Sequence, residues 1–275
     1  MKNQLKTAVL LGSLGGFMLL VGQLIGGQQG LYVALIFALF SNFMAYFYSD
    51  KFVLRVYRAK ELSVSEYPRV HQIVNKLCKS NNMKKPRVYL IPSNNPNAFA
   101  TGRNQNHSVI GLTQGILDLL NEKELKGVIA HELGHIKNKD ILIGSIAATM
   151  ATTISFLANM AQWAAIFGSR DRNNNIFSML IIALITPIIA AIIQMAISRS
   201  REFQADKTGA KFAKDTEGLS SALKKMETRS KAVPMRMGDT ASSHLFIVNP
   251  FSKELFSTHP STDARIKRLK NMKIN

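Results

Sequence analysis

Long stretches without a charged side chain constrain this 275-residue sequence more than any other feature. Three runs lack Asp, Glu, Lys and Arg altogether: 43 residues from Thr7 to Ser49, 29 from Ile141 to Ser169, and 26 from Asn173 to Ser198. About 20 consecutive apolar residues cross a bilayer as a helix. The runs therefore predict four membrane-spanning helices and exclude a soluble monomer. We place these helices at roughly 7–26, 31–49, 141–168 and 174–198.

The placement of the basic residues predicts the orientation in the membrane. The sequence has 35 Lys and Arg against 17 Asp and Glu, and 31 of the basic residues lie in 50–140 and 199–275. Basic residues near membrane ends favour the cytoplasmic side. We therefore expect a multi-pass membrane protein with both termini and both large segments in the cytoplasm. Its one cysteine, Cys78, fits that reducing compartment. Membrane lipids are expected partners, and nucleic acid is not.

The sequence predicts a mainly α membrane protein with a small β-sheet in its cytoplasmic part. We divide the chain into two N-terminal membrane helices (1–49), a first cytoplasmic part (50–140), a membrane hairpin (141–198) and a second cytoplasmic part (199–275). Hydrophobic periodicity predicts a helix over 67–79, a strand over 87–92, a hairpin of 97–100 with 108–112, and a helix from 122 toward the third span. Residues 199–275 are expected to be mainly helical, with a loop near 230–262.

The motif His131-Glu132-Leu133-Gly134-His135 carries the chemistry. Side chains four residues apart differ by roughly 40° around a helix and 6 Å along it, so both imidazoles can reach one metal ion. Glu132 points partly aside, where it can take a proton from a water at the metal. Imidazole and carboxylate ligands suit zinc, and we expect one zinc ion per chain. The alternative is a cytoplasmic helix with two surface histidines.

A catalytic zinc needs a third protein ligand, and the predicted membrane hairpin brings Glu202 to the right depth. His135 lies about 9 Å before the third span, and Glu202 about 6 Å beyond the fourth. Asp206 follows Glu202 by one helical turn and can accept the distal N–H of a ligand histidine. Pairing of Glu202 with Arg199 or Arg201 in solvent is the alternative for this residue.

These residues resemble the gluzincins, and in particular the HtpX family of membrane zinc proteases. The resemblance is carried by His131-Glu-x-x-His135, by Arg199-x-x-Glu202-x-x-Ala205-Asp206, and by further matches at Asn97-Ala-Phe99, Asn138-x-Asp140, Ser243-His-Leu245 and Ser257-Thr-His-Pro-Ser261. It covers essentially the whole chain. It implies a gluzincin-like protease domain and a zinc endopeptidase of the bacterial cytoplasmic (inner) membrane that degrades damaged or misfolded membrane proteins under stress. Membrane-protein or unfolded polypeptide substrates are therefore expected, while the oligomeric state stays open.

The resemblance also implies supporting residues. His259 and Arg265 match the prenyl proteases related to the family and are candidates for stabilising the oxyanion of the tetrahedral intermediate. His259 is also a candidate inhibitory zinc ligand, and the alternative is a cap of the helix that starts near Pro260. The alternative for Arg265 is one more basic residue on an amphipathic helix, Arg265–Lys270, near anionic lipid. Asn97, Ala98, Phe99 and Ala100 resemble the edge strand on which gluzincins align substrate, which would bind an extended peptide through its backbone.

Two other functions remain as alternatives. An intramembrane site-2-type protease also uses His-Glu-x-x-His, but its aspartate ligand lies in a Leu-Asp-Gly-like stretch, and this sequence has none. A basic, non-catalytic membrane scaffold would account for the charge without using Glu132. The distinguishing property is whether the chain cleaves a polypeptide with Glu132 as the base.

Overall fold

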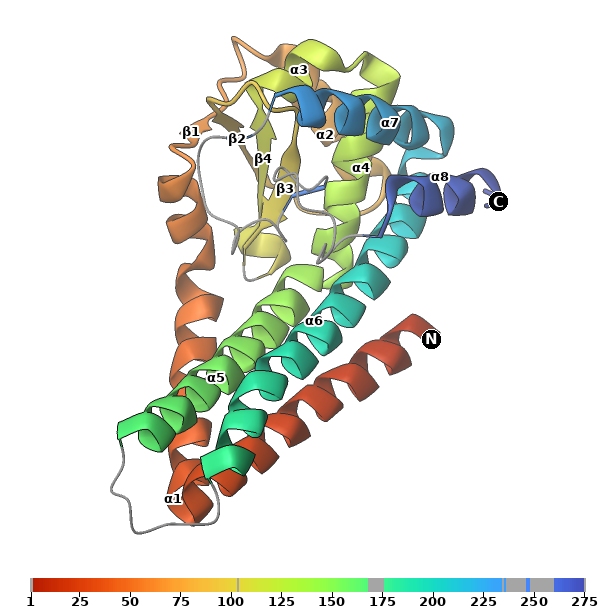
Figure 1. Ribbon diagram of the computed structural model, residues 1–275. Coiled ribbons are helices and arrows are strands. Elements are labelled where there is room, and N and C mark those ends of the chain that lie inside the picture. The colour runs from red at the N-terminus through yellow and green to blue at the C-terminus, as the bar shows by residue number, and fades with distance from the viewer. Residues whose placement is uncertain are drawn as a thin grey trace. The chain divides into compact units, whose positions relative to one another are not determined.

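A computed structural model describes residues 2–102, 104–167, 176–233, 235, 246–247 and 260–274 (Figure 1). The chain divides into two compact units. We call the unit made of Met1–Tyr46 and Ile143–Ile197 the helical unit, and the unit made of Phe47–Leu142 and Ser198–Asn275 the sheet unit. The predicted mainly α fold with a small sheet is confirmed.

The elements follow one another along the chain. They are α1 (Lys2–Val56), β1 (Lys60–Glu61), α2 (Pro68–Ser80), β2 (Arg87–Ile91), β3 (Ala98–Thr101), the short 3₁₀ helix η1 (Gln105–His107), β4 (Val109–Thr113), α3 (Gln114–Leu119), α4 (Glu122–Asn138), α5 (Asp140–Phe167), α6 (Ile176–Ala213), α7 (Glu217–Ala232) and α8 (Thr262–Lys270).

The helical unit is built from the apolar parts of α1, α5 and α6. Its core joins Leu14 and Met18 of α1 to Ala151 and Ile154 of α5 and to Ala190 of α6. Helix α1 is interrupted at Gly27, whose φ of 56° lies in the left-handed region that glycine adopts without a steric penalty. This interruption lies inside the link predicted between the first two spans.

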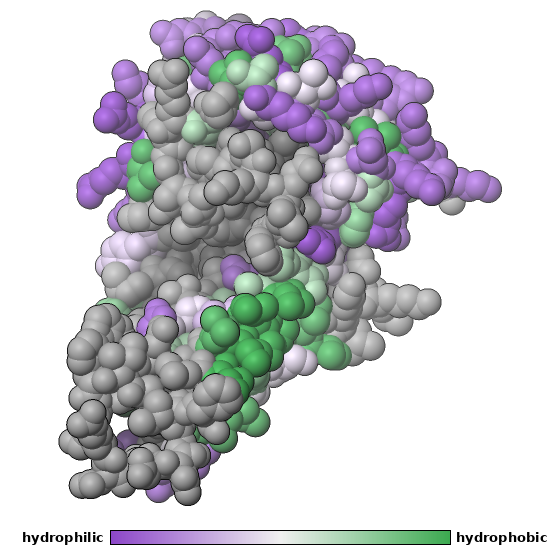
Figure 2. Space-filling model, viewed as in Figure 1, coloured by the Kyte–Doolittle hydropathy of each residue, from purple (hydrophilic) through white to green (hydrophobic). Residues whose placement is uncertain are grey.

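Large apolar side chains are exposed on the helical unit. Figure 2 shows apolar side chains gathered along α6, where Leu184, Ile185, Ile188, Ile189 and Ile192 are exposed. Among the residues that the structure describes, one helical stretch, Leu184–Ala213, is long and apolar enough to cross a membrane. The four-span topology therefore stays a prediction.

The sheet unit contains one four-stranded mixed sheet in the order β1-β2-β4-β3. Strands β2 and β4 are parallel, and β3 pairs antiparallel with β4 through Ala98 opposite Leu112 and Thr101 opposite Val109. The predicted hairpin is thus present, and β3 is at the edge of the sheet. Helices α2, α4 and α7 pack with the sheet around one hydrophobic core (Figure 1).

Two helix boundaries differ from the expected pattern. Helix α4 does not run on into α5, because Lys139 has a left-handed backbone with a φ of 59° and ends the helix. Helix α6 instead continues without a break through the predicted end of the fourth span to Ala213. Glu202 therefore lies on the same helix as that span. Most of the predicted loop near 230–262 lies outside the described residues.

Candidate metal centre

Helix α4 carries the three residues of the His-Glu-x-x-His motif. It begins with a capping box in which Asn121 and Glu124 each satisfy a backbone N–H of the other, so its start is fixed by sequence. Its apolar residues are buried in the core of the sheet unit. His131 and Glu132 are buried with them, at 0% and 1% exposure. Polar side chains this deeply buried need specific partners.

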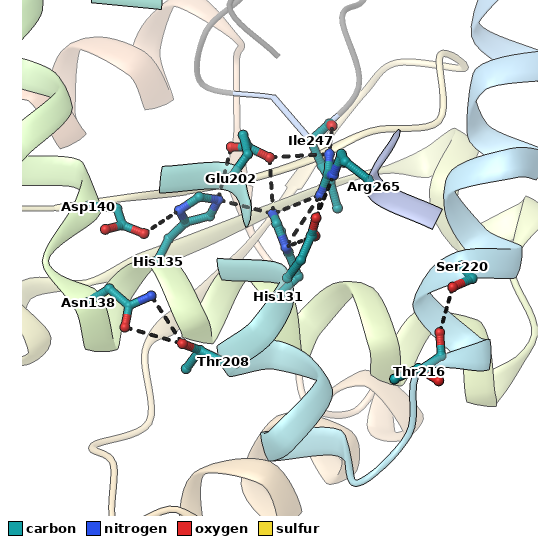
Figure 3. Close-up of polar contacts among 11 residues, drawn as sticks. His131, His135, Asn138, Asp140, Glu202, Thr208, Thr216, Ser220, Ile247 and Arg265 are labelled. Atoms are coloured by element: carbon teal, nitrogen blue, oxygen red, sulfur yellow. Dashed lines mark hydrogen bonds and ion pairs between the residues drawn. The ribbon is translucent and has the colours of Figure 1, made fainter. Parts of the chain in front are cut away.

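Helix α6 brings Glu202 to the two histidines (Figure 3). The Nε2 atoms of His131 and His135 lie 3.0 Å apart. Glu202 lies 3.6 Å from Nε2 of His131 through Oε2 and 3.3 Å from Nε2 of His135 through Oε1. These ligand atoms all lie within 4.8 Å of one another. Two imidazole nitrogens and one carboxylate that converge in this way match the donor set of a catalytic zinc site.

The far nitrogen of His131 faces an aspartate. Its Nδ1 lies 3.0 Å from Oδ1 of Asp206, one turn after Glu202 on α6. Asp206 in turn accepts two hydrogen bonds from Arg265, from Nε at 3.0 Å and from Nη2 at 2.7 Å. The predicted contact between Asp206 and a histidine of the motif is therefore present in the structure.

The guanidinium of Arg265 on α8 forms its hydrogen bonds and ion pairs with residues of its own chain. In addition to Asp206, its guanidinium lies 3.2 Å from Oε2 of Glu202 and donates a hydrogen bond of 2.8 Å to the backbone carbonyl of Ile247. It is 2% exposed. In this arrangement Arg265 holds two carboxylates in place. Its predicted role in stabilising an oxyanion stays a prediction.

The far nitrogen of His135 faces a second aspartate, Asp140, which the sequence analysis did not assign to the site. His135 Nδ1 lies 3.0 Å from Oδ2 of Asp140, and Arg201 forms an ion pair with the same carboxylate. The sequence did contain a signal, the motif Asn138-x-Asp140. On an unbroken helix, however, residues five apart differ by about 140°, which would have directed Asp140 away from His135.

Burial and charge shift the proton affinities of the site. Burial lowers the pKa of both histidines, but neighbouring carboxylates outweigh this effect and raise both pKa values above the ordinary value. The carboxylates are Asp206 and Glu202 for His131, and Glu202 for His135. Burial raises the pKa of Glu132, which the nearby histidines only partly offset. A raised pKa suits a carboxylate that must accept and return a proton near neutral pH.

The predicted edge strand contacts another segment of the same chain. The backbone N–H of Ile247 donates a 3.0 Å hydrogen bond to the carbonyl of Ala98 in β3. Phe246 packs edge-on against Phe99 and Tyr57, with ring centroids 5.5 and 5.1 Å apart. The carbonyl of Asn97, by contrast, points toward β4 and accepts a hydrogen bond from Thr113. Ala98 thus offers its carbonyl on the open side of the sheet.

One predicted site residue, His259, lies outside the described residues, as do the matched residues Ser243-His-Leu245. Helix α8 begins just after it, with Ser261 as the cap that accepts a hydrogen bond from the N–H of Ala264. Ser261 thus takes the cap position that one alternative gave to His259, and the oxyanion-stabilising and inhibitory roles of His259 stay predictions.

Comparisons with known proteins agree with this geometry. Residues 65–273 match Peptidase family M48. Proteins named "Protease HtpX homolog" are similar over almost the whole chain. The one from Desulforapulum autotrophicum is 47% identical and the match covers 98% of this chain and 90% of the relative. The one from Aquifex aeolicus is 49% identical and the match covers 94% and 89%. The one from Pyrococcus furiosus is 46% identical and the match covers 97% and 95%.

A solved structure shares the fold. The crystal structure of Ste24p from S. mikatae matches with a TM-score of 0.60 and 18% sequence identity over 94% of this chain. The chain spans 62% of the length of that protein. At this identity the similarity concerns the fold.

Proposed function

Because the chain belongs to Peptidase family M48, among the HtpX proteases, we propose that His131, His135 and Glu202 hold its zinc ion and that Glu132 is its general base. Family membership makes the protein a zinc metalloprotease of a membrane, and neither the scaffold nor the site-2-type alternative is favoured. The observation that carries the assignment is the convergence of the three ligand atoms to within 4.8 Å beside a buried Glu132.

The side chains of the site have separate parts in peptide hydrolysis. A zinc ion, when bound, polarises the scissile carbonyl and increases the acidity of a water. Glu132 takes a proton from the attacking water and passes it to the leaving amine as the C–N bond breaks. Asp206 and Arg265 keep His131 and Glu202 in place during this step. Oxyanion stabilisation by Arg265 and His259 belongs to the same proposal.

The substrate is proposed to be an unfolded or misassembled membrane protein. The open side of β3 offers the backbone carbonyl of Ala98, and the contact with Ile247 shows that this carbonyl accepts a hydrogen bond from another chain segment. Binding by added-strand hydrogen bonds depends on the backbone and tolerates many side chains. Such tolerance suits an enzyme that removes damaged proteins under stress.

We further propose four membrane spans, with both termini and the metal centre in the cytoplasm. Helix α5 has 28 residues and α6 has 38, so each is at least about 42 Å long and exceeds the roughly 30 Å hydrocarbon core. Interruption of α1 at Gly27 supports a turn between two shorter spans. Contact with lipid follows from this arrangement.

Cysteine labelling tests the topology. Gln28 is exposed next to the interruption of α1, and Lys76 is exposed on α2. A membrane-impermeant maleimide should label Gln28→Cys in intact cells and Lys76→Cys only after lysis. The natural thiol gives little background, because burial raises the pKa of Cys78 to about 11. Labelling of both positions in intact cells would refute the proposed orientation.

A paired cleavage assay tests the catalytic assignment. Full-length protein and its Glu132→Gln variant, purified without metal and loaded with zinc, are given an unfolded protein as substrate. We expect cleavage by wild type and a loss of about 100-fold or more in the variant, with zinc still bound to both. Glu122→Gln is the matched control, because Glu122 lies on the same helix with its side chain 68% exposed. Equal cleavage by wild type and Glu132→Gln would overturn the assignment.

A further inference from the structure

Asp140 reaches His135 although the two residues are five positions apart. On a continuous helix their side chains would point about 140° apart. In the structure the Oδ2 atom of Asp140 lies 3.0 Å from Nδ1 of His135, and the aspartate is 5% exposed. A local change of the backbone between the two residues must therefore direct the carboxylate of Asp140 toward His135.

That change is the left-handed conformation of Lys139. Its φ of 59° ends α4 and allows α5 to begin in a new direction at Asp140. Residues other than glycine, asparagine and aspartate rarely adopt this conformation, which is retained where surrounding contacts enforce it. The contacts around Lys139 should therefore include one that holds the helix end in place.

Arg201 supplies that contact, from the position directly before the ligand Glu202. Its Nη2 atom donates a 2.8 Å hydrogen bond to the carbonyl of Asn138, the last residue of α4. The same guanidinium forms an ion pair with Asp140. The carbonyls at a helix end lack partners within the helix, so Arg201 both satisfies one of them and fixes the aspartate. Arg201 is 4% exposed, which sets it apart from a solvated basic residue.

We propose that Asp140 and Arg201 are positioning residues for zinc binding. Together they fix the ring of His135 so that its Nε2 atom faces His131 and Glu202. This inference rests on the proposed metal centre. The arrangement repeats, on the other histidine, the contact of His131 with Asp206 and Arg265. Each histidine of the motif is thus held by an aspartate, and each aspartate by a buried arginine. Arg201 and Glu202 are adjacent on α6. The ion pair of Arg201 with Asp140 therefore also links the position of Glu202 to the ring orientation of His135.

Zinc affinity of the full-length protein, measured by competition with a chromophoric chelator, tests the proposal without relying on activity. We expect Asp140→Ala to bind zinc about 10- to 100-fold more weakly than wild type. Asp140→Asn should recover part of the loss, because its amide oxygen can still accept the N–H of His135. Arg201→Gln should also weaken binding, and Arg201→Lys should weaken it less. Lys207→Ala is the control, since it removes a positive charge from an exposed position of the same helix.

The double variant Asp140→Ala/Arg201→Gln identifies how Arg201 acts. If Arg201 works through Asp140, the double variant binds zinc no more weakly than Asp140→Ala alone. The double variant also removes both buried charges, so it remains informative if Asp140→Ala does not fold. Its zinc-free melting temperature is measured in parallel. A purely structural pair would lower that temperature while zinc affinity stays within about twofold of wild type, and this result would overturn the proposal.

His135→Ala separates failure of this inference from failure of the metal centre. Loss of zinc binding in His135→Ala together with wild-type affinity in Asp140→Ala would refute only the positioning role. Wild-type affinity in His135→Ala would refute the metal centre itself.

Discussion

Gly209 lies where α6 crosses α4, and replacing it by alanine tests how closely these two helices must approach. A Cβ atom at this position would lie 2.7 Å from Cα and 2.8 Å from N of His131. Both are backbone atoms, so no side chain can rotate out of the way. Carbon atoms pack best at about 3.5–4.0 Å, and the helices must therefore separate by about 1 Å near His131.

The consequence for function should be larger than the consequence for stability. Overpacking lowers the free energy of unfolding by about 1–3 kcal/mol, and the higher helix propensity of alanine offsets about 1 kcal/mol of this loss. Ligand distances in zinc sites, by contrast, tolerate only about 0.2 Å. Because Glu202 moves with α6 and the histidines with α4, we expect zinc affinity to fall at least about tenfold. A misplacement of this size lowers kcat/KM by about 100-fold.

The assay combines chelator competition, peptide cleavage and thermal unfolding of Gly209→Ala. Gly144→Ala is the matched control, because a Cβ at this helical position of α5 has no neighbour within 4 Å. The control should keep wild-type zinc affinity and activity. Wild-type affinity and activity in Gly209→Ala would refute the argument that the approach of α6 to α4 sets the ligand geometry.

Three further predictions concern separate contacts. Glu202→Ala should lose most of its zinc affinity, measured by chelator competition, and wild-type affinity would mean that the third ligand lies elsewhere. Burial opposes ionisation of Glu124, but hydrogen bonds from Lys225, Ser221 and the N–H of Asn121 outweigh it and hold its pKa below the ordinary value. Glu124→Gln should therefore unfold more easily in urea at neutral pH, by about 1 kcal/mol, and the difference should vanish as the pH falls below about 4; a pH-independent difference contradicts this. Ile247→Pro removes the N–H that the carbonyl of Ala98 accepts. If substrate pairs with the same edge, KM for an unfolded protein should fall, whereas a lower kcat with unchanged KM would show that Ile247 only supports the site.

The elements with strong local signals could be predicted from sequence. The helix expected over 67–79 is α2, the strand over 87–92 is β2, and the predicted hairpin is β3 with β4. Apolar periodicity and a Gly/Asn-rich turn specify such elements locally. Convergence of Glu202 with the two histidines could also be anticipated, because it follows from the chain path and the rise of a helix.

The remaining contacts of the site depend on features without a local signature. The direction of the chain at Asp140 depends on the sign of φ at Lys139, and lysine has no preference for the left-handed region. Arg201 stands in a run of basic residues that normally face solvent, and only the approach of α6 to the end of α4 buries it. Ile247 meets Ala98 across 149 positions of the sequence, a pairing that no periodicity encodes. In each case tertiary packing decides the outcome.

The charges buried around the candidate metal centre explain why these contacts belong together. Among the described residues there, four carboxyl groups and two guanidiniums are at most 5% exposed: Glu132, Asp140, Glu202, Asp206, Arg201 and Arg265. With the four carboxylates and both guanidiniums charged, their formal sum is minus two, which one zinc ion balances while His131 and His135 stay neutral. Buried charge that lacks compensation is costly. Without the ion, protons on the two histidines and on Glu132 offset this charge, in agreement with the raised pKa values of all three groups. Zinc binding must therefore release protons, and its affinity must fall in acid.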